Sequence, residues 1–207
     1  MSNIFNRFIK NESGSIPIEG LMGILLLLGW YAIAFEFYDA FRMRAKASKA
    51  AYTVADLLSR QQEEIGPRFV GGMKKVYDYV AEARISERSW MRVSLIECRA
   101  ENDDWDPCDG VNKKVSLISS YSTEPTVDTH TDTTIKNESY RIPIMSAGET
   151  SSIVETSSYY NPVIGIGDKV MIMGGESTRI GLSSSVRFSN FVVTPPRDER
   201  HIWNTSK

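Results

Sequence analysis

Residues 14 to 30 read G-S-I-P-I-E-G-L-M-G-I-L-L-L-L-G-W, and this stretch is almost purely apolar. It belongs to a run from Ile16 to Phe35 in which Glu19 is the only charged residue. The 20 residues of the run make a helix of about 30 Å, which matches the hydrocarbon core of a bilayer. A secretory signal peptide has a shorter apolar core and small residues at a cleavage site after it, whereas the bulky and charged E-F-Y-D-A-F-R-M-R follows here. The run therefore predicts a retained transmembrane helix.

A polar leader precedes the apolar run and a helical segment follows it. Pro17 falls in the first turn of the expected helix, where proline is tolerated, and the next proline is Pro67. Small and apolar side chains at spacings of three and four predict an amphipathic continuation to about Glu64. These side chains are Ala47, Ala50, Ala51, Val54, Leu57 and Leu58. Gly66 and Pro67 end this helix, and a second helix is predicted from Pro67 to Arg84.

The second half of the chain has the pattern of strands. Apolar and polar side chains alternate from Met91 to Ile96, which is typical of a half-buried strand. The acidic, Thr-rich segment 124–134 is expected to be an irregular loop. Gly, Pro, Asn and Asp separate the further predicted strands, which lie at 115–121, 139–145, 152–160, 169–173 and 179–194.

The predicted fold class is therefore α+β. A long N-terminal transmembrane and amphipathic helix precedes a mostly antiparallel β domain. The expected divisions are a leader at 1–14, a transmembrane helix at 15–41, a helical stalk and second helix at 42–85, and a β-rich domain at 86–207.

The composition offers little material for catalysis or for nucleic-acid binding. The formal net charge is −2, which gives no electrostatic case for a nucleic acid. The two histidines, His130 and His201, and the two cysteines do not form a zinc-binding pattern. G-I-G-D at 165–168 lacks the third glycine of a dinucleotide loop, and no Ser-His-Asp or Cys-His pairing stands out. We expect no enzymatic activity, no metal and no cofactor.

Gly14 ends the leader, Ser15 follows it, and Glu19 stands five residues past the glycine. This arrangement resembles the processing site of type IV pilins and pseudopilins. The resemblance implies that a prepilin peptidase cuts after Gly14, so that Ser15 becomes the new amino terminus. An ammonium and a carboxylate attract strongly in a low dielectric. Glu19 of one chain is then expected to pair with the amino terminus of a neighbour during assembly.

Finer details point to one branch of that family. They comprise a second glutamate about one membrane thickness later, then an aromatic and basic patch, then an alanine-rich helix: Glu36, Phe37 to Arg44, and Ala45 to Ala55. From Gly14 to Ser59 the chain resembles TadE/TadG-like proteins of tight-adherence (Tad, type IVc) pili. The resemblance implies a minor pilin or pseudopilin whose partners are the peptidase, other pilins and Tad inner-membrane assembly proteins.

The same resemblance implies a bacterial inner-membrane protein with its C-terminal domain in the periplasm or in the extracellular pilus. One signal opposes this topology, because a positive-inside count puts the large domain in the cytoplasm. Basic residues are denser after the apolar run (Arg42, Arg44, Lys46, Lys49) than before it (Arg7, Lys10). We give more weight to the cysteine pair, the Ser/Thr-rich strands and the pilin-like leader.

An envelope location favours a disulfide between Cys98 and Cys108, which have nine residues between them. A loop of this size stabilises by roughly 2–3 kcal/mol in the chain-entropy model. The alternative is two free thiols in a reducing compartment. The alternative function is an uncleaved, membrane-tethered binding module, such as an envelope sensor or adhesin, in which Glu19 lies at the headgroup level.

Overall fold

The computed structural model describes residues 15–83, 89–99, 107–109, 114–165, 170–173, 176–179, 182–198 and 200–206. The chain forms two compact units. The smaller unit comprises residues 1–41 and 162–183, and the larger comprises residues 42–161 and 184–207. Helix α2 (Ser15–Ser59) contributes its first part to the smaller unit and its second part to the larger.

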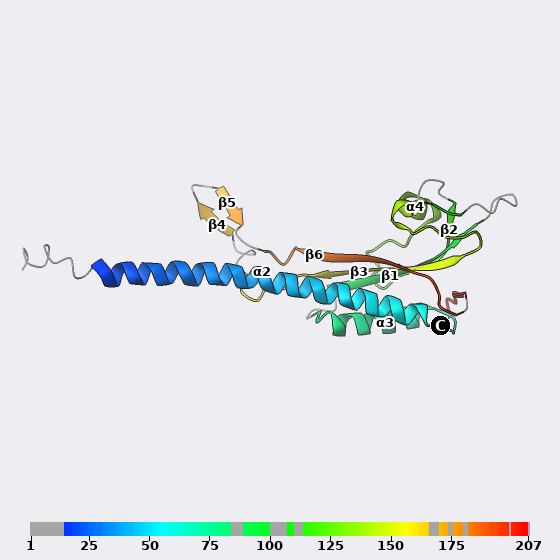
Figure 1. Cartoon of the computed structure of the whole chain (residues 1–207), viewed down its shortest axis with the longest axis horizontal. Coiled ribbons are helices and arrows are strands. Elements are labelled where there is room, and N and C mark those ends of the chain that lie inside the picture. The colour runs from blue at the N-terminus through cyan, green and yellow to red at the C-terminus, as the bar shows by residue number, and fades with distance from the viewer. Residues whose placement is uncertain are drawn as a thin grey trace, which may run out of the picture. The chain divides into compact units, whose positions relative to one another are not determined.

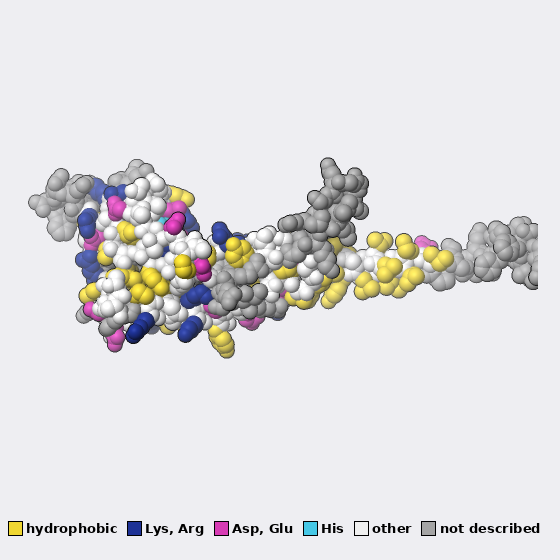
Figure 2. All heavy atoms as spheres, turned by 180° about the vertical axis from the view of Figure 1, so that it is seen from behind, with side chains coloured by type: hydrophobic (Ala, Val, Ile, Leu, Met, Phe, Trp, Pro, Cys, Tyr) yellow, Lys and Arg dark blue, Asp and Glu magenta, His cyan; other side chains and the backbone are white. Residues whose placement is uncertain are grey.

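The first part of α2 is an apolar rod whose side chains are exposed. Hydrophobic side chains dominate the face of this part that Figure 2 shows. Its exposed large hydrophobic residues are Ile18, Leu21, Met22, Ile24 to Leu28, Trp30, Tyr31, Ile33 and Phe35. A core helix of a soluble protein is mostly buried, whereas none of the most apolar window of this helix is. Within the described residues, α2 is the one helix long and apolar enough to be a membrane span or a signal sequence.

The second part of α2 buries the stripe that the sequence predicts. Its buried residues are Met43, Ala47, Ala50, Ala51, Val54, Ala55 and Leu58. Leu57, which we expected on this face, is exposed. The helix ends at Ser59 and not near Glu64, because the chain turns to pair with the C-terminal segment. There the Ile65 N–H donates to the Ile202 carbonyl at 2.8 Å.

Helix α3 (Pro67–Val80) begins as predicted, with Gly66 as its N-cap and proline in its first turn. It buries Val70, Met73 and Tyr77. The helix ends four residues before the expected Arg84. Glu82 adopts the left-handed conformation at φ 51°, which stops helical hydrogen bonding there.

A four-stranded antiparallel sheet in the order β2-β1-β3-β6 forms the centre of the larger unit (Figure 1). Its strands are β1 (Ser89–Cys98), β2 (Val115–Ser122), β3 (Thr150–Tyr159) and β6 (Arg187–Thr194). In the smaller unit, β4 (Val170–Met173) and β5 (Glu176–Arg179) form a separate antiparallel pair. The α+β class and the antiparallel sheet are thus confirmed.

Hydrophobic clusters cover both faces of the four-stranded sheet. On one face, α2 from Ala50 onward and α3 pack against Met91, Val93 and Leu95 of β1 and Val154 of β3. On the other face, Ile96 and Ile153 meet the disulfide and Ile135 of helix α4 (Asp132–Glu138). Alternation along each strand assigns every side chain of the sheet to one face or the other.

Three predicted elements of the second half of the chain differ from the structure. A short helix, α4, followed by the 3-10 turn η3 (Ser139–Arg141) replaces the strand expected at 139–145 and part of the loop expected at 124–134. Thr131 and Thr134 cap α4 reciprocally through their side chains, which stabilises the start of this helix. The strand expected at 179–194 is divided, because a turn at Ser184 and Ser185 separates β5 from β6.

Candidate functional site

The predicted processing and assembly residues lie at the start of α2. Gly14 lies outside the described residues, and Ser15 is the first residue of the helix. Glu19 is exposed one turn further on, among the exposed side chains of Ile18, Leu21 and Met22. No hydrogen bond or ion pair reaches Glu19 from the described part of the chain.

An isolated carboxylate on this surface is costly in lipid. Insertion scales assign about 2.5–3.5 kcal/mol to a charged residue at the centre of a membrane helix. Glu19 therefore needs either water at the headgroup level or a cation from another group. Ser15 begins the helix, and Glu19 follows four residues later.

Glu36 and Asp39 lie near the end of the transmembrane helix predicted at 15–41. The structure buries them, with 2% and 5% of their surface exposed. Neither carboxylate is therefore displayed to bulk water, although large apolar side chains remain exposed beyond Glu36, at Phe37, Tyr38 and Phe41.

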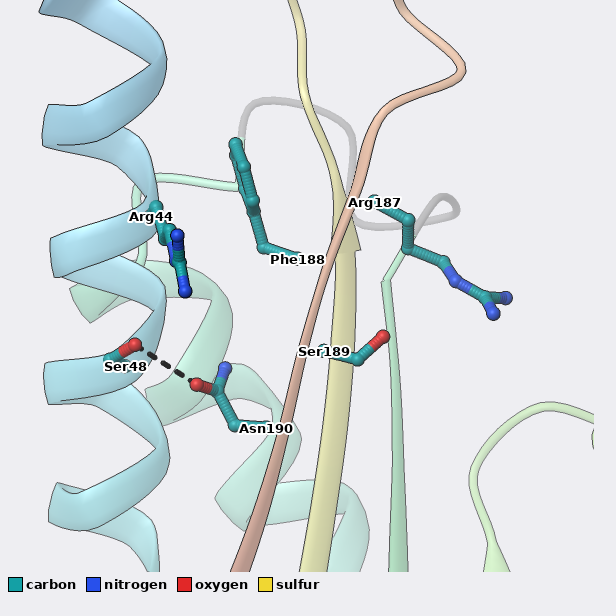
Figure 3. Close-up of a pocket in the computed structure, with 6 residues that line it drawn as sticks. All are labelled: Arg44, Ser48, Arg187, Phe188, Ser189 and Asn190. Carbon is teal, nitrogen blue, oxygen red and sulfur yellow. Dashed lines mark hydrogen bonds between the residues drawn. The ribbon is translucent and has the colours of Figure 1, made fainter.

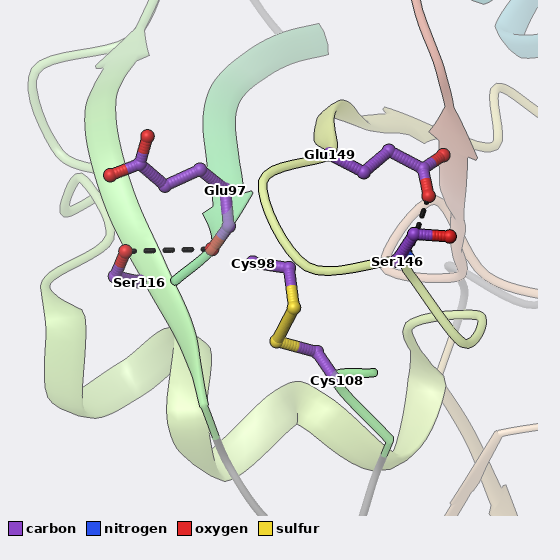
Figure 4. Close-up of a disulfide and its surroundings, with 6 residues drawn as sticks. All are labelled: Glu97, Cys98, Cys108, Ser116, Ser146 and Glu149. Carbon is purple, nitrogen blue, oxygen red and sulfur yellow. Dashed lines mark hydrogen bonds between the residues drawn. A yellow bond between two sulfur atoms is a disulfide. The ribbon is translucent and has the colours of Figure 1, made fainter. Parts of the chain in front are cut away.

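The disulfide between Cys98 and Cys108 is present and buried (Figure 4). Backbone hydrogen bonds tie both cysteines to the turn before β3. Cys98 N–H donates to the Glu149 carbonyl at 2.9 Å, and Cys108 N–H donates to the Met145 carbonyl at 2.8 Å. The bridge therefore anchors the end of β1 to this turn and completes the second hydrophobic cluster.

Three charged or titratable side chains meet on the α4 side of the sheet. Arg92 Nε donates to Glu155 Oε2 at 2.6 Å, and His130 Nε2 lies 2.7 Å from the same oxygen. Burial alone raises the pKa of Glu155, but the hydrogen bonds and positive charges of His130 and Arg92 outweigh it and hold that pKa below its usual range. Sequence analysis missed this network because strand pairing places Arg92 opposite Glu155 across 63 residues.

A serine and a histidine that lie 49 residues apart in the sequence also meet. Ser152 Oγ lies 2.8 Å from His201 Nδ1. Both residues are buried, with 0% and 6% exposed, so a substrate cannot reach the hydroxyl. Burial lowers the pKa of His201, which keeps the imidazole neutral at pH 7. This pair fixes the C-terminal segment against β3.

No group of three or more His, Cys, Asp or Glu side chains in the described residues is arranged to hold a metal ion. Comparisons with protein-family models, with curated proteins and with solved structures gave no match to this chain.

Proposed function

We propose that this chain is a Tad-type minor pilin or pseudopilin, held in the bacterial inner membrane and cut after Gly14 by a prepilin peptidase. It takes part in the assembly of an adhesive pilus and has no catalytic role of its own. The observation that carries the proposal is the exposed apolar first part of α2, which bears the single carboxylate of Glu19 near its start.

Such a surface suits a helix that moves from contact with lipid to contact with the helices of identical or related subunits. In the membrane, lipid tails cover its hydrophobic side chains, and in a fibre the helices of neighbouring subunits do so. The carboxylate of Glu19 makes the exchange selective, since it gains a cation only when a neighbouring amino terminus is in register.

The disulfide supports a periplasmic location for the larger unit, because such bonds persist in oxidising compartments. Two of the basic residues that oppose this topology form ion pairs within the folded larger unit. Arg42 and Lys46 both form ion pairs with Glu82 beyond the end of α3. The positive-inside count applies to short loops and loses force for folded domains.

Substitution of Glu19 tests the proposal. Glu19→Gln keeps the shape of the side chain and removes the charge, so cleavage after Gly14 should continue while recovery of the chain in sheared pilus fractions should fall sharply. Leu26→Gln is the matched control, because it adds the same amide to another exposed position of α2. Normal incorporation of the Glu19→Gln protein would contradict the proposal.

A second candidate function is an uncleaved, membrane-tethered binding module. An arginine-lined groove on the sheet favours it, as described below. Replacing residues 1–41 with an unrelated signal anchor separates the two functions. A pilin should lose its activity in pilus assembly after the exchange, whereas a binding module should keep its ligand.

A further inference from the structure

An open groove of about 430 Å³ lies on the sheet face opposite α2 and α3. Strand pairing brings its floor together, because Arg92, Glu155 and Phe191 form one cross-strand row and Trp90 and Ser189 belong to the next. Ser189 is small and exposed, so the surface is hollow between Arg187 and Phe191, its neighbours on the same face of β6. The loop after β2 and the turn η3 form the wall, through Thr126, Val127 and Arg141.

The groove is positively charged. Arginines at 92, 141 and 187 line it, and Glu155 is the one carboxylate among the described residues of its lining. That carboxylate is already shared between Arg92 and His130, so it does not repel an anion. The volume of the groove is in the range of small-ligand sites.

Arg187 is the arginine best placed to receive a ligand. Its side chain is exposed, and no ion pair or hydrogen bond reaches it from the described residues. Arg141, by contrast, pairs with Glu138 at 2.9 Å and stacks over Phe191, with its guanidinium carbon 3.9 Å from the ring centroid. A free guanidinium binds a carboxylate through two parallel hydrogen bonds.

A second hollow of about 330 Å³ adjoins the first around the edge of β6 (Figure 3). It shares Arg187 and Ser189 with the groove and adds Arg44 of α2. Ser48 Oγ donates to Asn190 Oδ1 at 2.9 Å, and Figure 3 shows this pair on the α2 side of the strand. None of the described residues that line this hollow carries a carboxylate.

We propose that the two hollows together bind an acidic polysaccharide, with a sugar carboxylate on Arg187. Exposed hydroxyls suit the sugar hydroxyls, and Trp90 offers aromatic surface to the C–H face of a sugar ring. Positive charge continues from Arg141 past Arg187 to Arg44, so the site favours a repeating anion over a single small one. This proposal is independent of how the chain is anchored or processed.

Isothermal titration of the detergent-purified full chain with galacturonate oligomers tests it. Binding should weaken as salt rises. Arg187→Ala should lower the affinity at least about tenfold, since a charge-assisted contact is lost. Ser189→Tyr should also weaken binding by filling the hollow. Arg68→Ala is the matched control, because Arg68 is an exposed arginine on α3, and it should leave binding unchanged.

Neutral galactose oligomers should bind far more weakly than the acidic ones. Equal binding of poly-glutamate would favour an acidic peptide and overturn the proposal, as would unchanged affinity in the Arg187→Ala protein with an unaltered melting curve. Competition with acidic polysaccharide from the producing cell and with hyaluronan then distinguishes a self-derived source from a foreign surface. Failure of both to displace the oligomers would also count against the proposal.

Discussion

Replacing Arg92 with methionine should destabilise the larger unit by about 3–5 kcal/mol, because it leaves a buried carboxylate without its main cation. The side chains of Arg92 and Glu155 are only 15% and 12% exposed, so solvent screens their attraction weakly. Arg92 also donates to the Asp128 carbonyl at 2.6 Å, and this bond is lost as well. For a unit of this size the loss corresponds to a fall in Tm of about 10–15 °C.

The double variant Arg92→Met/Glu155→Gln is the control. It removes both charges, so most of the lost stability should return. Recovery should be incomplete, because each substitution also removes hydrogen bonds of the network. The assay is thermal unfolding of the detergent-purified full chain, followed by near-ultraviolet circular dichroism. A loss below about 1 kcal/mol in the single variant, or a double variant as unstable as the single, would refute the reasoning.

Three further predictions concern the same unit. Joint replacement of Cys98 and Cys108 by serine should cost about 3 kcal/mol for this loop, measured by urea unfolding, and an unchanged midpoint would contradict a stabilising bridge. The folded-state pKa of His201 is lowered, so its stability contribution is present above the unfolded pKa near 6.5 and is lost as the pH falls. The free energy of unfolding should change by at most about 1.4 kcal/mol per pH unit through this group. His201→Gln should remove this pH dependence from the unfolding curves. Leu58→Ala should cost about 2–5 kcal/mol by leaving a core cavity, whereas the exposed Leu57→Ala should cost little; equal losses would place the core elsewhere.

Elements with local signals were predictable from the sequence. The spacing of Ala47, Ala50 and Val54 indicates the buried face of α2, and Pro67 marks the start of α3. Alternation from Met91 identified β1, because each residue's face is set by its own strand.

Features that depend on pairing between distant segments were not predictable. The end of α2 moved because Ile65 pairs with the C-terminal segment. The short helix α4 depends on a Thr131–Thr134 cap that overrides the weak strand pattern after it. Without a known register, nothing in the sequence placed Arg92 beside Glu155.

The candidate functional features likewise include one that was predictable from the sequence and one that was not. Glu19 was identifiable because a lone glutamate in an apolar run is conspicuous in the sequence. The groove around Arg187 was not, since strand order brings its arginines together from three separate segments.

Mapping the amino terminus of the envelope-extracted protein by mass spectrometry tests the pilin proposal most directly. The account predicts a mature chain that begins at Ser15. A chain that retains Met1, or that starts beyond the apolar run of α2, would contradict processing after Gly14 and leave the tethered binding module as the better explanation.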